Sequence, residues 1–349
     1  MARRNQTQKP SIRDVAELAG VSRTTVSYVL NNVTSIQISE ATRKRVLDAA
    51  HELDYHPNAI ARSLARKQTL TVGLVLCVSP DRLIADAFLP SVIYGISSVT
   101  TPAGFRLLIE VVEDVTRPDA YVRLIREAQI DGVILAGARL GDQHLLDLHP
   151  DNFPMVLWDH LPGSDLPFVD IDNVSSARAA VEHLIDLGHQ HIGCITNAPL
   201  DHPASAGRLR GYQIALEAHG LTYDQALVRY GDFQERSGFE AMSSLLPERP
   251  TAVFVASDVV ALGALRAVRN AGLRVPRDLA MVGFDDIQFA QYLLPPLTTV
   301  RVPAHEIGAT AARMLLNILQ NSNRPTSVLL DTELIIRESC GAQLRTESA

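Results

Sequence analysis

One set of side chains with the types and spacing for chemistry lies near the start of the chain. Arg23, Thr24, Ser27 and Tyr28 share the outward side of a short helix that Ser22 would cap. Arginine can contact guanine with two parallel hydrogen bonds, and threonine can reach a base edge or a thymine methyl group. These residues could therefore read the edges of base pairs in duplex DNA.

A second set lies at the ends of predicted strands. Asp159 ends PMVLWD, Ser257 ends TAVFVAS and Asp285 ends LAMVGFD. The carboxyl ends of parallel strands meet at one edge of a sheet, where ligands bind in α/β proteins. Carboxylates accept hydrogen bonds from neighbouring hydroxyl groups, so this set suits a polyol. Asp285 could instead cap the following helix, and we expect Asp258 to be a helix cap outside the site.

Motifs for catalysis or cofactors are missing from the sequence. We find no GxGxxG after a strand, no GxxxxGK[ST], no GxSxG and no HExxH. The three cysteines are far apart and lack CxxC spacing, which argues against a zinc site or a disulfide framework. We therefore expect no metal, no cofactor and no catalytic residues, although eleven histidines leave an unrecognised acid–base site open.

Three short helices are predicted over residues 11–53, and they would position the first set. Ser11 and Asp14 form a capping box, Gly20 ends the first helix, and Ser39 starts the third. In the third helix we expect Val46, Leu47, Ala50 and Leu53 to face inward. A glycine at the tight junction between the first two helices is typical of a helix-turn-helix, whose second helix enters the major groove.

A different pattern begins at Leu70, and it would position the second set. Continuously apolar runs alternate with amphipathic helices at 173–187, 204–219 and 259–271. Such strands predict parallel sheets covered on both faces, and 280 residues are long for one sheet, so we expect two doubly wound α/β lobes. The predicted strands are 70–76, 105–112, 131–137, 154–159, 191–196, 251–257 and 279–285.

The charge distribution also separates the two parts. Residues 1–67 hold 11 Lys and Arg against 6 Asp and Glu, whereas the whole chain carries a net charge of −7. A basic head on an acidic body indicates that the head meets a polyanion, although a merely solvated surface would have the same composition. No apolar run has the roughly 18 residues of a membrane span, and the start MARRNQTQKP does not resemble a secretory signal. We expect a cytoplasmic protein without a membrane partner.

The sequence resembles the lactose-repressor (LacI/GalR) family of transcription regulators. The similarity covers IRDVAELAGVSRTTVSYVLNN, ISEATRKRVLDAAHELDYHPNAIARSLA, EHLIDLGHQHIG, GRLRGYQIAL, VFVASDVVALGALRAVRNAGLRVPRDLAMVGFDD and PPLTTV, in that order. Two departures are Tyr28, where many members carry arginine, and a long turn from Asn31 to Ser39. The resemblance implies a helix-turn-helix DNA-binding domain at 1–57, a hinge helix and linker at 58–69, and a periplasmic-binding-protein-like sensor at 70–349.

The resemblance also implies roles for the hinge. In the family, paired hinge helices enter the minor groove of operator DNA, and a leucine from each one wedges between base steps. Leu64 stands at that position, with Asn58 and Ala61 beside it. A helix of about nine residues is too short to be stable alone, which fits a segment that orders only on DNA. Alternatively, Leu64 is an ordinary core residue.

Further effector contacts follow from the same resemblance. It favours Asp159, Arg208, Ser257 and Asp285, adds Phe233 as an aromatic that stacks on the ligand, and adds Phe88 and His202. Arg208 could instead be a surface residue and Phe88 a core residue. The inserted run VSPDRLIADA forms one wall of the expected crevice.

The implied function is a DNA-binding repressor released from a palindromic operator by a small, sugar-like effector. A homodimer is expected because the C-terminal tail carries no heptad repeat. The alternatives are an enzyme on the same α/β fold, or a sugar-binding protein without a DNA role.

Overall fold

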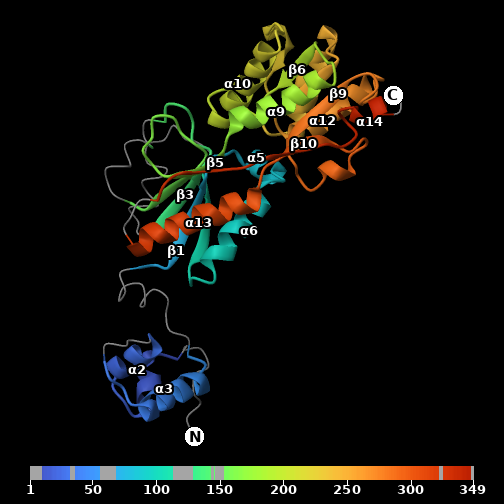
Figure 1. Ribbon diagram of the computed structural model, residues 1–349. Coiled ribbons are helices and arrows are strands. Elements are labelled where there is room, and N and C mark those ends of the chain that lie inside the picture. Colours follow the sequence, from blue (N-terminus) through green and yellow to red (C-terminus); the bar gives the residue numbers. More distant parts are fainter. Residues whose placement is uncertain are drawn as a thin grey trace. The chain divides into compact units, whose positions relative to one another are not determined.

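A computed structural model describes residues 10–31, 36–55, 68–112, 129–142, 145, 153–321 and 325–346. The chain divides into two compact units, Met1–Leu70 and Thr71–Ala349. We call them the head and the sensor, and describe each by itself (Figure 1).

The head contains three helices, α1 (Ile12–Ala19), α2 (Arg23–Leu30) and α3 (Glu40–Glu52). Gly20 ends α1 with a φ of 64°, a left-handed conformation that a side chain would disfavour. The Asp14 carboxylate accepts hydrogen bonds from the backbone N–H and the hydroxyl of Ser11, both at 2.8 Å. Each helix start thus lies where the sequence predicts it.

Small and branched apolar residues fill the core of the head. Val15 of α1, Val26 of α2 and Val46 of α3 are fully buried. The prediction that Leu47 faces inward is wrong, because its side chain is 48% exposed. The buried face of α3 follows Val46, Ala49 and Ala50, and a residue one position after Val46 points about 100° away from that face.

The first lobe of the sensor is a six-stranded sheet in the order β11-β5-β4-β3-β1-β2. Every pair in it is parallel, and Leu74 of β1, next to the edge strand β2, lies opposite Ile109 on one side and Ile134 on the other. Its elements are β1 (Thr71–Leu76), α5 (Pro80–Ala85), α6 (Leu89–Thr100), β2 (Arg106–Val111), β3 (Gly132–Ala136), β4 (Met155–Trp158), β5 (Phe168–Ile171), α13 (Ala304–Asn321) and β11 (Val328–Leu330).

The second lobe repeats this architecture with the order β12-β10-β9-β8-β6-β7. Its edge strand β12 runs antiparallel to β10, which departs from the expected parallel sheet. Its elements are α9 (Asn173–Asp186), β6 (Ile192–Ile195), α10 (Pro203–Ala218), β7 (Val228–Arg229), α11 (Glu235–Leu245), β8 (Ala252–Val255), α12 (Asp258–Asn270), β9 (Ala280–Asp285), β10 (Thr298–Arg301) and β12 (Glu333–Ile335), followed by α14 (Ala342–Thr346).

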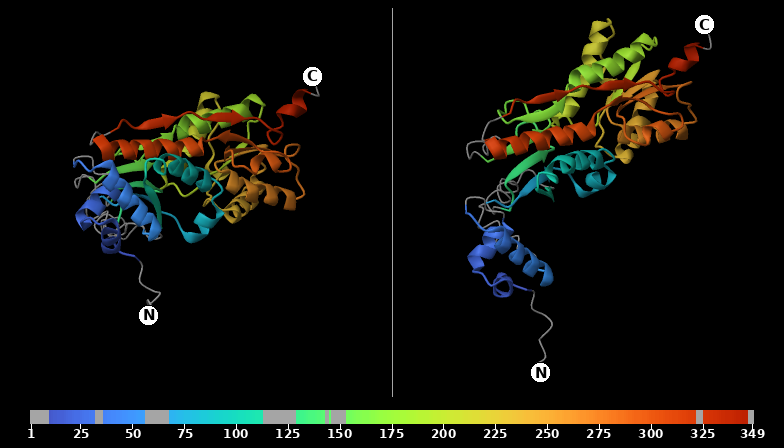
Figure 2. Two further views of the ribbon diagram at one scale, coloured as in Figure 1. Left: turned by 90° about the horizontal axis from the view of Figure 1, so that it is seen from below. Right: turned by 60° about the horizontal axis from the view of Figure 1, so that its bottom comes forward.

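Three segments of the described chain join the lobes. The chain leaves lobe 1 after β5, returns between β10 and α13, and leaves again between β11 and β12. Figure 2 shows β11 and β12 as one nearly continuous ribbon beside α13. The last part of the sequence therefore completes both sheets.

Buried apolar strands and closely packed helices hold each lobe together. Every residue of β3 and of β8 is buried, as expected for central strands covered on both faces. In lobe 1, a Cβ at Gly95 would collide with the carbonyl of His305, and one at Gly308 with the carbonyl of Val92. Helices α6 and α13 thus cross backbone to backbone at these two glycines.

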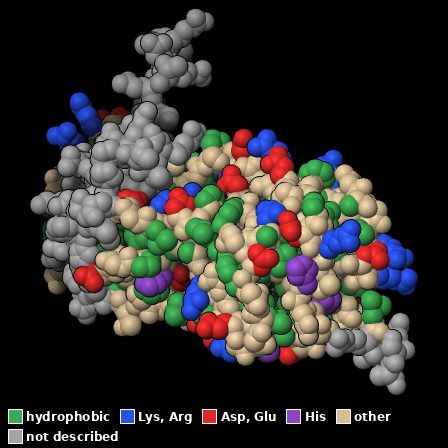
Figure 3. Space-filling model, turned by 90° about the horizontal axis from the view of Figure 1, so that it is seen from above, with side chains coloured by type: hydrophobic (Ala, Val, Ile, Leu, Met, Phe, Trp, Pro, Cys, Tyr) green, Lys and Arg blue, Asp and Glu red, His purple; other side chains and the backbone are tan. Residues whose placement is uncertain are grey.

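The sensor surface mixes the two signs of charge. On the face in Figure 3, acidic, basic and apolar side chains are interspersed. No helix in the described ranges has both the length and the apolar composition required to cross a bilayer.

Candidate functional site

The outward side of α2 carries the predicted base-reading residues. Arg23 and Thr24 are exposed, whereas Ser27 and Tyr28 are half-buried. The hydroxyl of Ser27 accepts a hydrogen bond from the Asn31 amide at 3.2 Å. Ser22 fixes the start of α2 by accepting the Thr25 backbone N–H at 3.1 Å. The two residues at the N-terminal end of α2 are therefore the most accessible of the four.

Basic residues on α3 have the exposure that phosphate contacts require. Lys44 and Arg45 are exposed and Arg43 is half-buried. The predicted hinge residues Asn58, Ala61 and Leu64 lie outside the described residues.

The second candidate site is a cavity between the two lobes of the sensor, at the carboxyl ends of their strands. It has a volume of about 100 Å³. All seven predicted effector residues line it, namely Phe88, Asp159, His202, Arg208, Phe233, Ser257 and Asp285. Residues separated by up to 197 positions are thus brought to one place, as the strand-end argument requires.

Three of these residues have an uncommon backbone conformation. The φ angles are 103° at Asp159, 51° at Phe233 and 115° at Asp285. Residues other than glycine seldom adopt positive φ, and such strained positions concentrate at ligand sites. All three residues line the cavity, and Asp159 and Asp285 do so at the ends of β4 and β9.

Arg208 organises the wall that lobe 2 contributes. Its guanidinium donates to the Asn173 side chain at 2.9 Å and to the Ala256 carbonyl at 2.7 Å, and contacts Asp285 at 3.4 Å. It also lies 3.8 Å from the centre of the Phe284 ring. Burial raises the pKa of Asp285 to about 6, although the Arg208 charge opposes this rise. The alternative of a surface arginine is excluded, since Arg208 is 7% exposed.

A carboxyl pair forms part of the opposite wall. Removal from bulk water raises the pKa of Asp159 to about 8, and the negative charge of Asp170 adds to this rise. Asp170 accepts the backbone N–H of His160 at 2.9 Å and the side-chain amide of Asn173 at 3.1 Å. At neutral pH the Asp159 carboxyl is therefore largely protonated and can donate as well as accept a hydrogen bond.

Aromatic rings complete the lining. Phe88 stacks on Trp158 with ring centres 6.0 Å apart, and His202 meets the ring of Phe233 edge-on at 5.3 Å. The guanidinium of Arg82 lies 3.5 Å from the centre of the Phe233 ring. One face of the Phe233 ring is thus covered by a side chain of α5.

Sequence reasoning missed several lining residues. Trp158 lies in the predicted strand 154–159, directly before Asp159, so its position could have been anticipated, whereas Asp170 lies in β5, which was not predicted. Arg82 and Asp86 lie in the inserted run VSPDRLIADA, and Asn197 follows β6. No periodic pattern marks an insertion residue as buried, which is why Arg82 escaped notice.

Asp258 differs from its predicted role. It is fully buried, and its carboxylate accepts the Ile287 backbone N–H at 3.1 Å and the Thr299 hydroxyl at 2.7 Å. Helix α12 begins at Asp258 itself, with Ser257 as the capping residue. The side chain therefore anchors the loop after β9 instead of capping a helix.

The chemistry available in the cavity is recognition by hydrogen bonds and aromatic contact. Within the described ranges, no three His, Cys, Asp or Glu side chains are grouped as ligands for a metal ion.

Comparisons with known proteins match both parts of the chain. Residues 11–58 match the family "Bacterial regulatory proteins, lacI family", and residues 181–340 match "Periplasmic binding protein-like domain". The transcriptional regulator CelR of Thermobifida fusca is 38% identical over 95% of this chain and 98% of its own. The transcriptional repressor CytR of Escherichia coli K12 is 39% identical over 98% of this chain and 99% of its own.

Solved structures agree with these matches. A Lac repressor dimer bound to operator and the anti-inducer ONPF has a TM-score of 0.85 at 31% identity, covering 95% of this chain and 99% of that one. A CelR–cellobiose complex has a TM-score of 0.74 at 36% identity, covering 95% and 99%.

The fold and the two sites define a DNA-binding transcription regulator with a small-molecule sensor. The chain belongs to the lacI family of bacterial regulatory proteins. The expected fold class, a helix-turn-helix head followed by two α/β lobes, is confirmed.

Proposed function

We propose that this protein is a transcriptional repressor that leaves a palindromic operator when a small sugar occupies the sensor cavity. The observation that carries the proposal is that a ligand-sized cavity and an exposed DNA-reading helix belong to one chain of the lacI family. The relatives CelR and CytR are named transcriptional regulators, and CelR has been solved with cellobiose.

Duplex DNA would be read by α2 in the major groove. Arg23 would contact guanine and Thr24 a neighbouring base, with Ser27 and Tyr28 toward the outer part of the half-site. Lys44 and Arg45 would contact phosphates, which supply affinity without sequence preference. Asn58, Ala61 and Leu64 would follow into the minor groove. A two-fold homodimer presents two such heads, which is why the operator is palindromic.

A sugar-like effector suits the chemistry of the cavity. Asp159 and Asp285 offer carboxyl groups to hydroxyls, Arg208 and Ser257 add polar contacts, and Phe88 with Trp158 offers apolar ring faces to sugar C–H groups. One enclosed water molecule needs roughly 10–15 Å³ of cavity volume. The cavity of about 100 Å³ therefore favours a ligand close in size to a monosaccharide.

Each function would belong to one predicted domain. Residues 1–57 would bind DNA, residues 58–69 would form the hinge, and residues 70–349 would sense the ligand. Ligand in the cavity contacts both lobes and so favours their closed arrangement. A shift of lobe 1 would change the spacing of the paired hinges in the dimer and lower operator affinity. Such couplings amount to about 1–3 kcal/mol. A regulator that acts on DNA in this way works in the cytoplasm.

Selection of bound sequences from a randomised duplex pool by the full-length protein tests the DNA side. The expected result is one enriched palindrome. A thermal-shift screen of monosaccharides and disaccharides, followed by a gel shift on that palindrome, tests the effector side, because a ligand that binds only the folded state raises its melting temperature. No enrichment of any site would overturn the proposal, and tighter operator binding with the effector would reverse the proposed sign.

A further inference from the structure

Arg82 of α5 is a buried cation without a counter-ion. Its side chain is 7% exposed, and its guanidinium rests on the Phe233 ring. No carboxylate of the described chain lies within 4.0 Å of it, and its Nε has no hydrogen-bond partner. Proteins almost never bury arginine unless it is paired, because an unpaired buried charge loses its hydration without compensation. The missing partner must be supplied from elsewhere.

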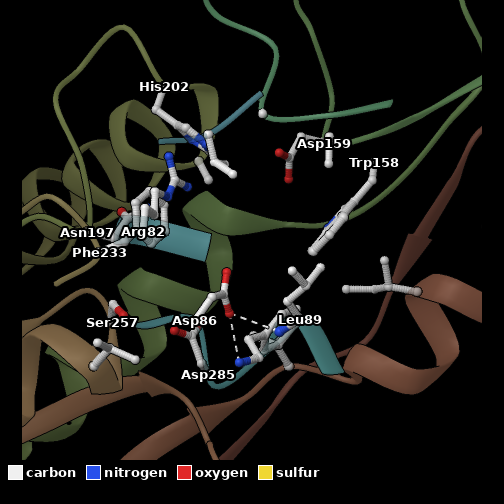
Figure 4. A pocket seen from close by; sticks show the side chains of 18 of the residues that line it. Arg82, Asp86, Leu89, Trp158, Asp159, Asn197, His202, Phe233, Ser257 and Asp285 are labelled. Atoms are coloured by element: carbon white, nitrogen blue, oxygen red, sulfur yellow. Dashed lines mark hydrogen bonds between the residues drawn. The ribbon is translucent and has the colours of Figure 1, made fainter. Parts of the chain in front are cut away.

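The side chains around Arg82 share this deficit. Asn197 is fully buried, and neither atom of its amide group has a partner. His202 is 3% exposed with an unpartnered Nδ1, and one Nη of Arg139 is buried without a partner. Figure 4 shows Arg82, Asn197 and His202 grouped with Phe233 on one side of the cavity. Three side chains that line one end of the cavity thus have unsatisfied polar atoms, and Arg139 is close enough to act on Arg82 and His202 electrostatically.

The carboxylates of the same cavity are satisfied by the protein. Asp86 accepts the backbone N–H groups of Phe88 and Leu89 at 2.8 and 2.9 Å, drawn as dashed lines in Figure 4. Asp170 accepts three groups, and Asp285 contacts Arg208. Because Arg82 carries only donors and no carboxylate of the described chain pairs with it, its absent partner is a hydrogen-bond acceptor, while the unpartnered Asn197 Oδ1 leaves a place for a ligand donor.

We propose that this end of the cavity binds the carboxylate of a sugar acid, with Arg82 as the residue that distinguishes acidic from neutral sugars. The inference rests on the proposed function and names the chemical class of the effector. The guanidinium of Arg82 donates to the carboxylate, and His202 contributes a neutral ring nitrogen. The amide of Asn197 can donate to one ligand oxygen and accept from a hydroxyl on the adjacent carbon, which a hydroxy acid provides.

The charges nearby favour a carboxylate over a phosphate ester. Arg82 lies on the binding side, and Arg139, Asp86 and Asp232 are close enough to act on it electrostatically. A single negative charge matches the unpaired guanidinium of Arg82, whereas a phosphate ester brings up to two. Repulsion from these carboxylates therefore disfavours the more highly charged group.

The test measures binding to the full-length protein by isothermal titration calorimetry. The probes are galacturonate, glucuronate and gluconate, each compared with galactose or glucose, and glucose 6-phosphate as the phosphate arm. The variants are Arg82→Met, which keeps the volume and removes the charge, and Arg266→Met as a matched control. Arg266 is exposed and lies 5.4 Å from the centre of the Phe239 ring, away from the cavity lining.

The expected result is that a sugar acid binds at least about tenfold more tightly than its neutral counterpart. Arg82→Met should remove that preference, while Arg266→Met keeps it. The unliganded Arg82→Met protein should also melt at a higher temperature than wild type, because an unpaired buried charge is gone. A purely structural role for Arg82 on Phe233 would instead lower the melting temperature.

Several results would overturn the inference. They are equal or tighter binding of neutral sugars, preference for the phosphate ester, undiminished acid binding by Arg82→Met, or failure of all the acids to bind. The proposed function can fail separately. If the protein binds a sugar acid but selects no DNA palindrome, this inference stands and the repressor role is wrong. If a neutral sugar alone releases the protein from the operator, the proposed function stands and this inference fails.

Discussion

The Asp285 carboxylate, at the end of β9, lies 3.4 Å from the guanidinium of Arg208, on α10. Both side chains line the cavity, and they join two elements of lobe 2 that are 77 residues apart in sequence. A ligand that contacts Asp285 therefore also acts on the position of Arg208, which in turn holds Asn173 at the start of α9.

Asp285→Ala should abolish the effector response and leave operator affinity within about twofold of wild type. The carboxylate that would accept ligand hydroxyls is removed, while no residue of the head is changed. Gel shifts with and without effector check this. Asp278→Ala, in an exposed ion pair with Arg274, is the matched control and should respond normally. If Asp285→Ala lost both functions together, misfolding around the unpaired Arg208 would explain the result better.

Arg23→Ala should relax base preference at one position of each half-site. Removing a bidentate contact costs about 1–3 kcal/mol against the preferred base. The measurement is binding to the selected palindrome and to its single-base variants. Lys44→Ala, on α3, provides the comparison, since loss of a phosphate contact should weaken all sequences alike. A uniform loss with Arg23→Ala would assign Arg23 to phosphate binding.

Leu64→Ala should weaken operator binding without changing effector affinity. An apolar wedge between base steps repays the cost of unstacking them by closer contact with bent DNA, and alanine is too small to act in this way. Gel shifts measure the first effect and calorimetry with the effector the second. Unchanged operator affinity would mean that Leu64 does not enter the duplex.

Asp159→Asn should flatten the pH dependence of stability. The pKa of Asp159 is raised from 3.8 to about 8 by burial, so the folded state binds this proton more tightly than the unfolded state. The resulting contribution to the free energy of unfolding is complete below pH 4 and is lost as the pH rises toward 8. Asparagine resembles the protonated form and avoids that loss.

Melting temperatures between pH 5 and pH 8.5 test this expectation. The melting temperature of Asp159→Asn should increase relative to that of wild type as the pH rises. The melting temperature of Asp165→Asn, on an exposed loop, should equal that of wild type at every pH. A constant difference between Asp159→Asn and wild type at every pH would show that the carboxyl does not titrate in this range.

Much of the fold could be predicted because local patterns and tertiary packing agree. All seven predicted strands are present, and helices α9, α10 and α12 begin within one residue of their predicted starts. Short strands such as β11 and β12 were not predicted. Each has three residues and pairs with a strand formed more than 30 residues earlier in the chain, so nothing local identifies it.

Some of the residues that line the cavity could be predicted from the sequence and others could not. Asp159 and Asp285 follow directly from their positions at strand ends. Arg82 does not, since its burial arises from the seating of α5 against Phe233 of the other lobe. An arginine in a polar insertion looks like a solvated residue until the fold places it. The stacking role expected for Phe233 stays a prediction, and the same seating of α5 places Arg82 over one face of its ring.

The three connections between the lobes also have a consequence for biosynthesis. Lobe 1 lacks α13 and the edge strand β11 until residue 330 has been made, although its sheet begins at Thr71. Lobe 2 in turn awaits β12, at residues 333–335. Neither half of the sensor can therefore finish folding before these segments have left the ribosome.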